Sequence, residues 1–425
     1  MNLLVVGGGG REHAIIKKLK ENPEVEKIYA LPGNGGIASD AECVSEIGAK
    51  DIEKIVGFAK EHGIDFAVVA PDDPLALGCV DRLHEIGIAC FGPDQKAARI
   101  EASKVFSKNL MKKYGIPTAE YAVFNDAKKA LSYLKTAEFP MVIKADGLAL
   151  GKGVLIVQDF EDAKKAVKTI MEDKAFGDSG NEIVIEEFLT GPEVSVLAFT
   201  DGKAIVPMVS SMDHKRAGDG DTGLNTGGMG TIAPNPYYTK ALADICMDTI
   251  FLPTLEAMRL EGCPFKGCLY FGLMMTPNGP KVIEYNCRFG DPETQVVLPL
   301  LKTDLLTIMQ AVENETLSEL KVEWHDGAAA CVILASGGYP GSYEKGKEMT
   351  IPENMPSNVM IYHAGDKLAD GKLVTNGGRV LGVTAAAPAL KEALKDAYDV
   401  AEKIQFEGKY MRHDIGKKAL MTQEV

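Results

Sequence analysis

Long apolar runs and an excess of basic residues are both missing from this sequence. No stretch approaches the roughly 20 apolar residues that a membrane-spanning helix needs. The apolar residues 3–6 run directly into four glycines, so we expect no signal peptide. The formal net charge of −14 disfavours nucleic acids and anionic membranes as partners, because both select a basic surface.

Metal-binding cysteine and histidine patterns are also missing. The eight cysteines are scattered, with no Cys-x-x-Cys pair, and there is no His-x-x-x-His pair. The sequence therefore offers no zinc site, and buried, reduced thiols in a cytoplasmic protein are the expected state. Internal repeats and low-complexity linkers are absent too.

What the sequence does contain is the composition of an ordinary globular protein, with 46% hydrophobic and 25% charged residues. A chain of 425 residues is expected to form about two to four domains. In the first hundred residues strand-like and helix-like segments alternate, which predicts a parallel α/β sheet. The expected strands are 3–6, 27–30, 66–70 and 88–91, and the expected helices are 11–20, 51–62 and 74–86. Such sheets bind ligands at the carboxyl ends of their strands, which here are the loops 7–12, 31–36 and 71–74.

Two further domains are expected after a connecting helix at 103–117. The expected strands are 141–145, 154–158, 182–187, 193–199, 204–209, 267–275 and 280–286, and the expected helices are 160–172, 239–261 and 304–314. A long polar loop is predicted at 211–236. A buried strand at 328–335 then opens a small α+β domain, so we place the domain limits at 1–102, 103–325 and 326–425.

Residues 284–294 carry the most informative pattern, Glu-Tyr-Asn-Cys-Arg-Phe-Gly-Asp-Pro-Glu-Thr. They follow a strand-like stretch, so the alternation of side chains puts Glu284 and Asn286 on one face. A carboxylate beside an amide oxygen makes a partial Mg²⁺ site, which nucleotide phosphates complete. Arg288 has the same parity and can hold a phosphoryl oxygen, and Asp291 can bind a polar substrate. An exposed acidic turn is the alternative interpretation of so short a motif.

A glycine-rich loop at 7–10 joins the first strand to the first helix, where backbone amides bind anions. It is not a dinucleotide fingerprint, because Glu12 stands where the third glycine belongs. The acid expected about twenty residues further on is missing as well. A terminal phosphate held by the loop and Arg11 fits better, and a purely structural turn is the alternative.

A second glycine-rich segment, 142–154, predicts a strand, a flexible loop and another strand. Lys144 would leave the first strand toward a nucleotide phosphate, and the loop would bring Lys152 over the phosphates. The segment is not a Walker A loop, because no Gly-Lys-Ser/Thr precedes a helix. A hairpin with a mobile tip is the alternative.

Two more segments suggest ligand contacts. Apolar residues of the strand at 183–189 could sandwich an adenine ring while Glu193 takes ribose hydroxyls. The predicted loop at 211–236 is dense in anion-binding groups, which is unusual for a loop without a ligand. Within it, His214 is a candidate general base, although a positioning role is favoured.

Together these segments resemble the glycinamide ribonucleotide synthetase family of the ATP-grasp superfamily, essentially from end to end. The matching motifs are GGREH, PGN, SK at 103–104, PTAEY, IKADGLALGKGV, IEEFL, DHKR, NTGGMG, NCRFGDPETQ, GGYPG and TNGGRV. The resemblance implies an N-terminal parallel α/β (pre-ATP-grasp) domain, an ATP-grasp domain with a mobile lid at about 124–190, and a small C-terminal α+β domain. It also implies ATP-dependent ligation of glycine to 5-phosphoribosylamine through a glycyl phosphate, in purine biosynthesis.

The resemblance implies roles for individual residues. ATP would be held by Lys104, Lys144, Gly147, Gly151, Lys152, Gly153, Glu186, Glu187, Leu189 and Glu193, and Mg²⁺ or Mn²⁺ by Glu284 and Asn286. Glycine and phosphoribosylamine would be bound by Gly9, Gly10, Arg11, Gly33, Asn34, Asp72, Asp213, Lys215, Asn225, Gly227, Gly228, Arg288 and Asp291. Four residues would act in catalysis, namely Arg288, Lys152, Asp213 and Asp291. No nucleophile is evident, so catalysis would rest on positioning and electrostatics.

Two features depart from the family pattern. Asp72 and Asp73 stand where the family has Glu-Ala, so either aspartate is a candidate for a ribose contact. The strand at 269–275 carries no acid, which leaves the metal ion to Glu284, Asn286 and phosphate oxygens.

Other classes of protein remain open at this point. Another ATP-grasp carboxylate–amine ligase would keep the nucleotide site and change the remaining loops. A nicotinamide oxidoreductase is disfavoured by the broken fingerprint, and a non-catalytic nucleotide sensor by the set at 284–288. We expect a monomer that binds neither nucleic acid nor membrane. Because phosphoribosylamine is labile, transient contact with the amidotransferase that produces it is a further hypothesis.

Overall fold

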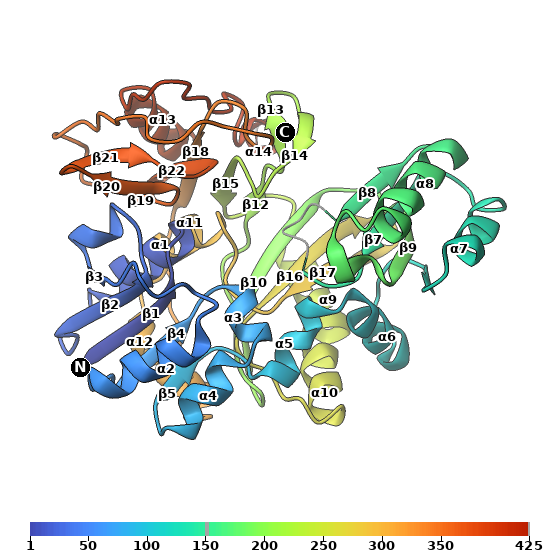
Figure 1. Ribbon diagram of the computed structural model, residues 1–425, viewed down its shortest axis with the longest axis horizontal. Coiled ribbons are helices and arrows are strands. Elements are labelled where there is room, and N and C mark those ends of the chain that lie inside the picture. Colours follow the sequence, from blue (N-terminus) through green and yellow to red (C-terminus); the bar gives the residue numbers. More distant parts are fainter. Residues whose placement is uncertain (149–152, 424–425) are drawn as a thin grey trace.

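The computed structural model describes residues 1–148 and 153–423 (Figure 1). Three regions surround a central antiparallel sheet: a blue N-terminal region, a teal and green region at the right, and an orange and red C-terminal region at the top. This combination of a parallel α/β region with antiparallel α+β regions confirms the fold class that the sequence predicts.

The N-terminal region is a five-stranded parallel sheet in the order β3-β2-β1-β4-β5. Its strands are β1 (Asn2–Gly7), β2 (Lys27–Pro32), β3 (Glu42–Cys43), β4 (Phe66–Val69) and β5 (Ala89–Phe91). Its helices are α1 (Gly10–Leu19), α2 (Ile52–Glu61), α3 (Asp72–Ala76), α4 (Cys79–Glu85) and α5 (Gln95–Ala102). Because the strand order switches direction beside β1, the loops after β1, β2 and β4 gather at one edge of the sheet.

The prediction of one helix at 74–86 was wrong. Gly78 separates α3 from α4 with a φ of 80°, a left-handed conformation that interrupts a helix. The first of the two helices begins at Asp72, earlier than expected. The short strand β3 and the helix α5 were also not predicted.

Helix α6 (Lys104–Tyr114) leads into a separate small unit, which we call the lid. Its antiparallel sheet, in the order β6-β9-β7-β8, consists of β6 (Tyr121–Phe124), β7 (Met141–Ala145), β8 (Val154–Val157) and β9 (Ile183–Glu187). Two helices, α7 (Ala127–Leu134) and α8 (Phe160–Val167), pack with it. The buried apolar residues of this unit form a cluster of their own within residues 124–185. This unit therefore has an apolar core of its own.

The central sheet has the order β11-β10-β16-β17 and is antiparallel. Its strands are β10 (Glu193–Asp201), β11 (Ile205–Pro207), β16 (Lys266–Thr276) and β17 (Gly279–Asn286). The helices around it are α9 (Lys240–Cys246), α10 (Leu252–Leu260), α11 (Thr294–Val297) and α12 (Leu305–Glu313). Tyr270 and Phe271 of β16 point into different apolar clusters, as alternation in a strand requires.

The C-terminal sheet, in the order β12-β15-β18-β22-β19, corrects a second prediction. Its strands are β12 (Met212–Asp213), β15 (Gly230–Ala233), β18 (Ala328–Ala335), β19 (Val359–His363) and β22 (Arg379–Ala387). The segment 211–236, expected as a loop, thus supplies two strands of this sheet, and β15 pairs with β18. Strands this short are set by tertiary pairing and leave little local signal.

The remaining elements complete the C-terminal region. The hairpins β13 (Arg216–Gly218)–β14 (Thr222–Asn225) and β20 (Asp366–Ala369)–β21 (Lys372–Thr375) flank the sheet, with helices α13 (Leu390–Ala401) and α14 (Lys417–Gln423). The C-terminal sheet contains strands from both sides of the domain boundary that the sequence suggests at 325/326, because β12 and β15 precede this boundary and the other three strands follow it.

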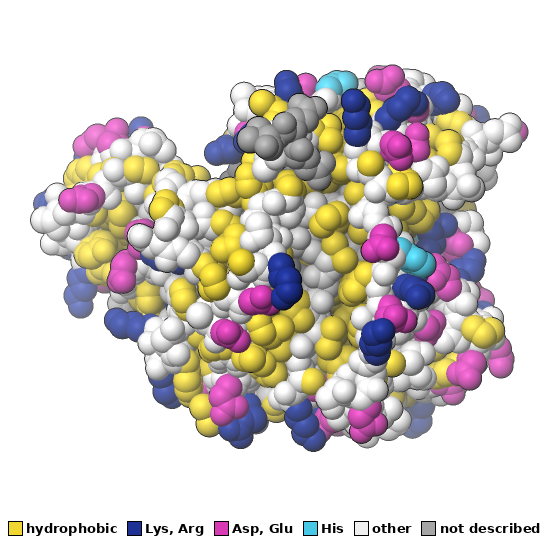
Figure 2. Space-filling view, turned by 180° about the vertical axis from the view of Figure 1, so that it is seen from behind, with side chains coloured by type: hydrophobic (Ala, Val, Ile, Leu, Met, Phe, Trp, Pro, Cys, Tyr) yellow, Lys and Arg dark blue, Asp and Glu magenta, His cyan; other side chains and the backbone are white. Residues whose placement is uncertain are grey.

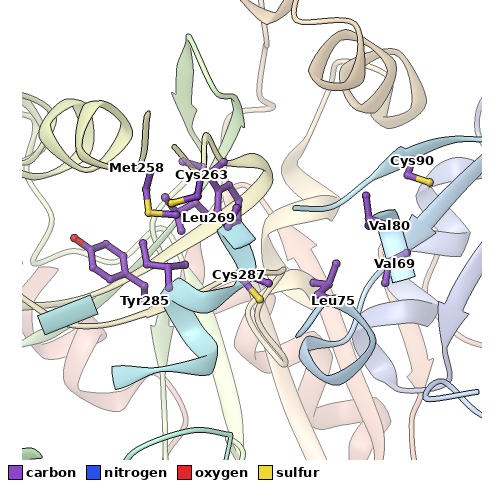
Figure 3. Packing of buried hydrophobic residues seen from close by; sticks show 14 of the residues in the cluster. Val69, Leu75, Val80, Cys90, Met258, Cys263, Leu269, Tyr285 and Cys287 are labelled. Carbon is purple, nitrogen blue, oxygen red and sulfur yellow. The ribbon is translucent and has the colours of Figure 1, made fainter. Parts of the chain in front are cut away.

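One apolar core joins the N-terminal region to the central sheet (Figure 3). Val69 and Leu75 of the N-terminal region lie beside Cys287, just after β17, and the cluster continues through Leu269 and Tyr285. This shared core fixes the loops of the N-terminal sheet relative to the end of β17. All eight cysteines are free thiols, and seven are buried. No helix in the described ranges is long and apolar enough to cross a membrane.

Candidate active site

The end of β17 presents two oxygen-bearing side chains on one face. Glu284 is paired with Gly272 of β16, and Asn286 is paired with Tyr270. A side chain at Gly272 would crowd this place, since a Cβ atom there would come within 3.2 Å of Glu284 Cγ. The glycine therefore leaves room beside the carboxylate.

Glu284 is surrounded by positive charge. Burial raises the pKa of its carboxyl, but Lys215, Lys144, Lys104 and Arg288 together lower it below the usual value. In the described ranges no residue donates a hydrogen bond to the side-chain carboxylate of Glu284; the neighbouring Lys144 and Arg288 donate to other acceptors. The group is thus an ionised carboxylate among cations, with its oxygen atoms free to bind an ion.

Arg288 is held by a carboxylate that the sequence analysis missed. Its Nη2 donates to Glu101 Oε1 at 2.8 Å and lies 3.3 Å from Asn286 Oδ1. Glu101, the penultimate residue of α5, also accepts a hydrogen bond from the backbone N–H of Cys287 at 2.7 Å. Glu101 precedes Arg288 by 187 residues, so only the fold brings the two together and no local pattern could have revealed the pair.

Asp72 and Asp73 have different surroundings. Asp73 pairs with the exposed Lys50 at 2.7 Å, on the outside of the molecule. Asp72 acts on the pKa of Arg288. Burial lowers the pKa of the Arg288 guanidinium, but the negative charges of Glu101 and Asp72 outweigh burial and raise this pKa above its usual value. Of the two candidates, Asp72 is therefore the one that interacts electrostatically with Arg288.

Asp291 is held by Arg379, a C-terminal residue that was not among the predicted site residues. Arg379 Nη1 donates to the backbone oxygens of Asp291 and Gly227, both at 2.8 Å, and Nη2 lies 3.4 Å from Asp291 Oδ2. Gln295 Nε2 donates to Asp291 Oδ1 at 2.8 Å. Burial raises the pKa of Asp291, but Arg379 and Arg11 lower it below the usual value.

The glycine loop after β1 lies against the loop after β2. A Cβ atom at Gly8 would collide with the backbone oxygen of Gly33, so only glycine fits there. The N–H of Gly9 donates to Glu12 Oε2 at 2.6 Å, and Arg11 Nε donates to Glu12 Oε1 at 2.6 Å. Glu12, which breaks the dinucleotide pattern, thus fills part of the loop.

Arg11 reaches the segment after β17, because its Nη1 donates to the backbone oxygen of Phe289 at 3.1 Å. Gly10 lies close to Gln295, whose Nε2 atom would be 2.7 Å from a Cβ atom at position 10. The predicted phosphate loop and the predicted metal segment are therefore neighbours.

The side chain of Asn34 makes hydrogen bonds within the protein. Its amide Nδ2 donates to the backbone oxygens of Gly8 at 3.0 Å and His363 at 2.8 Å. Its Oδ1 accepts from the N–H of Ile37 at 2.8 Å. The side chain ties the N-terminal loops to the C-terminal region, which leaves backbone groups for contact with a substrate.

The lysines predicted to bind nucleotide phosphates converge on the lid. Lys104 Nζ donates to the backbone oxygen of Gly147 at 2.7 Å. Lys144 is buried, and its Nζ lies 3.0 Å from Glu186 Oε1 and donates to the backbone oxygen of Ile283 at 3.3 Å. Both ammonium groups also contribute to the field at Glu284.

The loop between β7 and β8 is described only in part. Gly151 and Lys152, both predicted to contact ATP, lie outside the described residues. Gly153 is buried, and its backbone oxygen accepts from the N–H of Ala145 at 2.8 Å. Asp146, which the sequence analysis missed, accepts hydrogen bonds from Ser103 Oγ at 3.2 Å and the N–H of Val105 at 3.1 Å. It thereby fixes the start of this loop on α6.

The strand β9 and its continuation carry the predicted adenosine contacts. Glu187 accepts from the N–H of Glu120 at 2.8 Å and from Lys281 at 3.3 Å, and Leu189 is half-buried. Glu193 is exposed, and Lys215 Nζ lies 3.2 Å from its Oε2. A predicted nucleotide residue and a predicted substrate residue are therefore already in contact.

Asp213 lies in a polar cluster at the start of the C-terminal sheet. Burial and the neighbouring Glu293 raise the pKa of Asp213 well above its usual value. Glu293, a buried residue that the sequence analysis missed, accepts a hydrogen bond from Tyr270 at 3.0 Å. Gly228 leaves room for Asp213, whose Oδ1 atom would be 2.6 Å from a Cβ atom there. By contrast, Asn225 is exposed on the β13–β14 hairpin, with Arg216 as its strand partner.

His214 is a structural residue. Its Nδ1 contacts the backbone oxygen of Gly230 at 3.0 Å, and its Nε2 accepts from the N–H of Gly416 at 3.1 Å. Burial lowers its pKa to about 4. Both ring nitrogens are engaged, which agrees with the preference for a positioning role over that of a general base.

The arrangement as a whole places anionic and cationic groups from all three regions around the end of β17. In the space-filling view, the lid lobe stands at the left, and a notch separates it from the C-terminal part (Figure 2). Among the described residues no group of three or more His, Cys, Asp or Glu forms a metal cluster. A cation held by Glu284 and Asn286 would need further oxygen ligands, of the kind that phosphates supply.

Comparison with known proteins gives a consistent result. Models of the N, ATP-grasp (A) and C domains of phosphoribosylglycinamide synthetase match residues 1–101, 102–294 and 329–418. A phosphoribosylamine–glycine ligase from Caldanaerobacter subterraneus subsp. tengcongensis is 50% identical over 415 residues, which is 98% of this chain and 99% of the relative.

Solved structures agree in fold. The crystal structure of phosphoribosylamine–glycine ligase from Thermotoga maritima has a TM-score of 0.86 and 36% identity, covering 98% of this chain and 100% of that one. The biotin carboxylase domain of Hydrogenobacter thermophilus 2-oxoglutarate carboxylase, solved with MgADP and bicarbonate, has a TM-score of 0.73. At 16% identity over 96% of this chain and 91% of that one, it shares the fold alone.

Proposed function

The chain belongs to the phosphoribosylglycinamide synthetase family, and from this premise we propose how its residues join glycine to 5-phosphoribosylamine with ATP. The products of this ligase reaction are glycinamide ribonucleotide, ADP and phosphate, and the pathway is purine biosynthesis. The observation that carries the assignment of residues is the convergence at the end of β17, where Glu284, Arg288 and Asp291 meet Arg11, Lys215 and Arg379.

The chemistry requires activation of a carboxylate. A glycine carboxylate oxygen attacks the γ-phosphorus of ATP and ADP leaves, which forms glycyl phosphate. The amine nitrogen of phosphoribosylamine then attacks the carbonyl carbon, phosphate leaves, and the nitrogen loses a proton. No enzyme nucleophile is needed, so the residues act by positioning and by stabilising charge.

The groups around β17 fit these steps. Arg288, held by Glu101, stabilises negative charge on the transferring phosphoryl group. Lys215 lies between Glu193 and Glu284 and attracts the glycine carboxylate. Asp213, with its raised pKa, is suited to accept the proton from the attacking amine. The N-terminal loop with Arg11 binds the phosphate of phosphoribosylamine.

ATP enters between the lid and the central sheet, with Lys104 and Lys144 at its phosphates and β9 along the adenosine. The donor set of Glu284 and Asn286 fits Mg²⁺ or Mn²⁺, because both are oxygen ligands and Glu284 is ionised. A divalent ion there would neutralise charge on the phosphates. Closure of the lid would exclude water from the acyl phosphate, and its independent core permits such a motion.

The substrate assignment is tested by ADP release. The purified protein is given Mg-ATP and glycine, with and without phosphoribosylamine formed in situ from ribose 5-phosphate and ammonia. We expect ADP release that requires both substrates, with amide formed in equal amount. Release with bicarbonate or D-alanine, and not with this pair, would instead indicate another ATP-grasp ligase.

Three further proposals concern the compartment, the oligomeric state and the source of phosphoribosylamine. Eight free cysteines, seven of them buried, support a reducing compartment, namely the cytoplasm. We also propose that the chain is a monomer, which sedimentation would test. The lability of phosphoribosylamine supports direct transfer from the amidotransferase that makes it. In a coupled assay, transfer no faster than free diffusion would contradict this.

A further inference from the structure

Lys108 is a buried lysine with no role in the mechanism above. It lies on α6, four residues after Lys104, so both side chains project from the same face of the helix. Lys104 contacts the backbone oxygen of Gly147, in the loop that follows β7, whereas Lys108 is only 2% exposed. A buried ammonium group is costly unless it is paired and hydrogen-bonded.

The partners of Lys108 come from both sides of the lid junction. Its Nζ lies 3.0 Å from Oε2 of Glu186, in the lid strand β9. The same nitrogen donates to Thr118 Oγ1 at 2.8 Å, and Thr118 in turn donates to the backbone oxygen of Val282 in β17 at 2.7 Å. Lys108 therefore connects the lid to the strand that carries Glu284.

Glu186 is shared between two lysines. Its second oxygen, Oε1, lies 3.0 Å from Lys144 Nζ, and the carboxylate is only 3% exposed. The buried cluster thus contains two cations and one anion. If Lys108 neutralises Glu186, the charge of Lys144 remains available for a nucleotide phosphate. Without Lys108, Lys144 and Glu186 would form a closed pair with no net charge.

We propose that Lys108 is a positioning residue for nucleotide binding, which holds Glu186 so that Lys144 keeps a free positive charge toward the phosphates of ATP. This inference rests on the proposed function, because it assumes that Lys144 binds nucleotide. It adds a residue that contacts no substrate and acts through Glu186. Through Glu186, Lys108 also couples the position of strand β9 to the binding of ATP phosphates by Lys144.

The expected pH dependence supports a role for the charge. Burial is the largest influence on the pKa of Lys108 and lowers it, as does the charge of Lys144. Glu186 and Glu187 raise this pKa, and the net result is a pKa of about 8. The ring of Tyr121 lies 5.8 Å from the ammonium nitrogen. As the pH rises through about 8, Lys108 loses its proton and Glu186 retains only Lys144 as a partner. Affinity for ATP should then decrease.

The dissociation constant of Mg-ATP, measured in the absence of glycine and phosphoribosylamine, tests the proposal. We expect Lys108→Met to weaken binding about tenfold, the size of effect that one nearby charge produces in a partly screened site. Lys112→Met is the matched control, because Lys112 is exposed on the same helix and lies at the same 5.8 Å from Tyr121. Its affinity should be that of the wild type.

The double variant Lys108→Met/Glu186→Gln separates charge from packing. Removal of both charges leaves Lys144 as the only charged member of the cluster, so affinity should be higher than in Lys108→Met. A loss in the double variant equal to or greater than that in Lys108→Met would overturn the proposal. So would wild-type affinity in Lys108→Met itself.

A measurement on the wild type covers the case in which the variants do not fold. Its affinity for Mg-ATP should decrease above pH 8, and a constant affinity from pH 7 to 9.5 would contradict the proposal. A decrease that persists unchanged in Lys108→Met would also contradict it, since that decrease belongs to another group such as Lys104. Because ATP binding is measured alone, failure of the glycine-dependent reaction in the wild type would show separately that the proposed function is wrong.

Discussion

The guanidinium of Arg379 donates to the backbone oxygen of Asp291 at 2.8 Å and lies 3.4 Å from its carboxylate. Arg379 begins strand β22 of the C-terminal sheet, whereas Asp291 follows β17, an edge strand of the central sheet. The same guanidinium also binds the backbone oxygen of Gly227. One C-terminal residue thus holds two segments that are predicted to contact substrate, so the C-terminal region forms part of the site.

Arg379→Lys should raise the KM for glycine or phosphoribosylamine about tenfold while the KM for ATP stays nearly constant. Lysine keeps the charge but cannot bridge two carbonyl groups with one planar group. Steady-state kinetics with each substrate varied in turn would measure this. Arg412→Lys is the control, because Arg412 is bound by Asp221 and Asp414 away from the site and should affect thermal stability instead. Equal effects on all three KM values would contradict the prediction.

The two adjacent aspartates after β4 should behave differently. Asp72→Asn should weaken the use of phosphoribosylamine severalfold, because the charge of Asp72 acts on Arg288. Asp73→Asn should be close to the wild type, since it removes only a surface ion pair with Lys50, of a kind typically worth less than about 1 kcal/mol. The ratio of kcat/KM for phosphoribosylamine between the two variants is the measurement. A larger loss in Asp73→Asn would mean that the second aspartate makes the contact.

Glu284→Gln should lower turnover at least about 100-fold at limiting Mg²⁺ through lost affinity for the metal ion. Glutamine keeps the shape of the side chain but removes the negative charge that balances Lys215, Lys144, Lys104 and Arg288. The fold should remain intact, which circular dichroism and the melting temperature would show. Turnover should be measured over a series of Mg²⁺ and Mn²⁺ concentrations. Near-normal activity at limiting Mg²⁺ would remove Glu284 from the metal site.

The sequence predicts those features of the site that depend on local order. Strand alternation alone places Glu284 and Asn286 together, and the glycines at 7–10 indicate a loop at the end of β1. Alternating segments likewise predict the parallel N-terminal sheet. These patterns survive in the structure because each depends on residues that are close in the chain.

The features that were missed depend on tertiary contacts. Glu101 is 187 residues from Arg288, and Arg379 is 88 residues from Asp291, so neither pairing leaves a periodic signal. The contact between the amide of Asn34 and the backbone oxygen of His363, 329 residues away, could not be predicted either. The strand β15 is set by its pairing with β18 and not by its own composition.

The neutral state of His214 predicts a loss of stability in mild acid. Burial lowers its pKa to about 4, below the usual value of 6.5. As the pH decreases, the unfolded chain binds the proton first, so the contribution of His214 to stability is present above pH 6.5 and is lost as the pH falls toward 4. Between pH 7 and pH 5 this difference corresponds to about 2 kcal/mol of unfolding free energy.

Urea unfolding at pH 7 and pH 5, in the wild type and in His214→Gln, would measure this contribution. The variant should be less stable at pH 7, because it loses the contact with Gly230, but it should lose less stability than the wild type on acidification. His413→Gln is the control for the loss of a histidine from the surface, since His413 is exposed. An unchanged pH dependence in His214→Gln would assign the effect to another buried histidine, and His13, whose pKa burial also lowers to about 4, is the candidate.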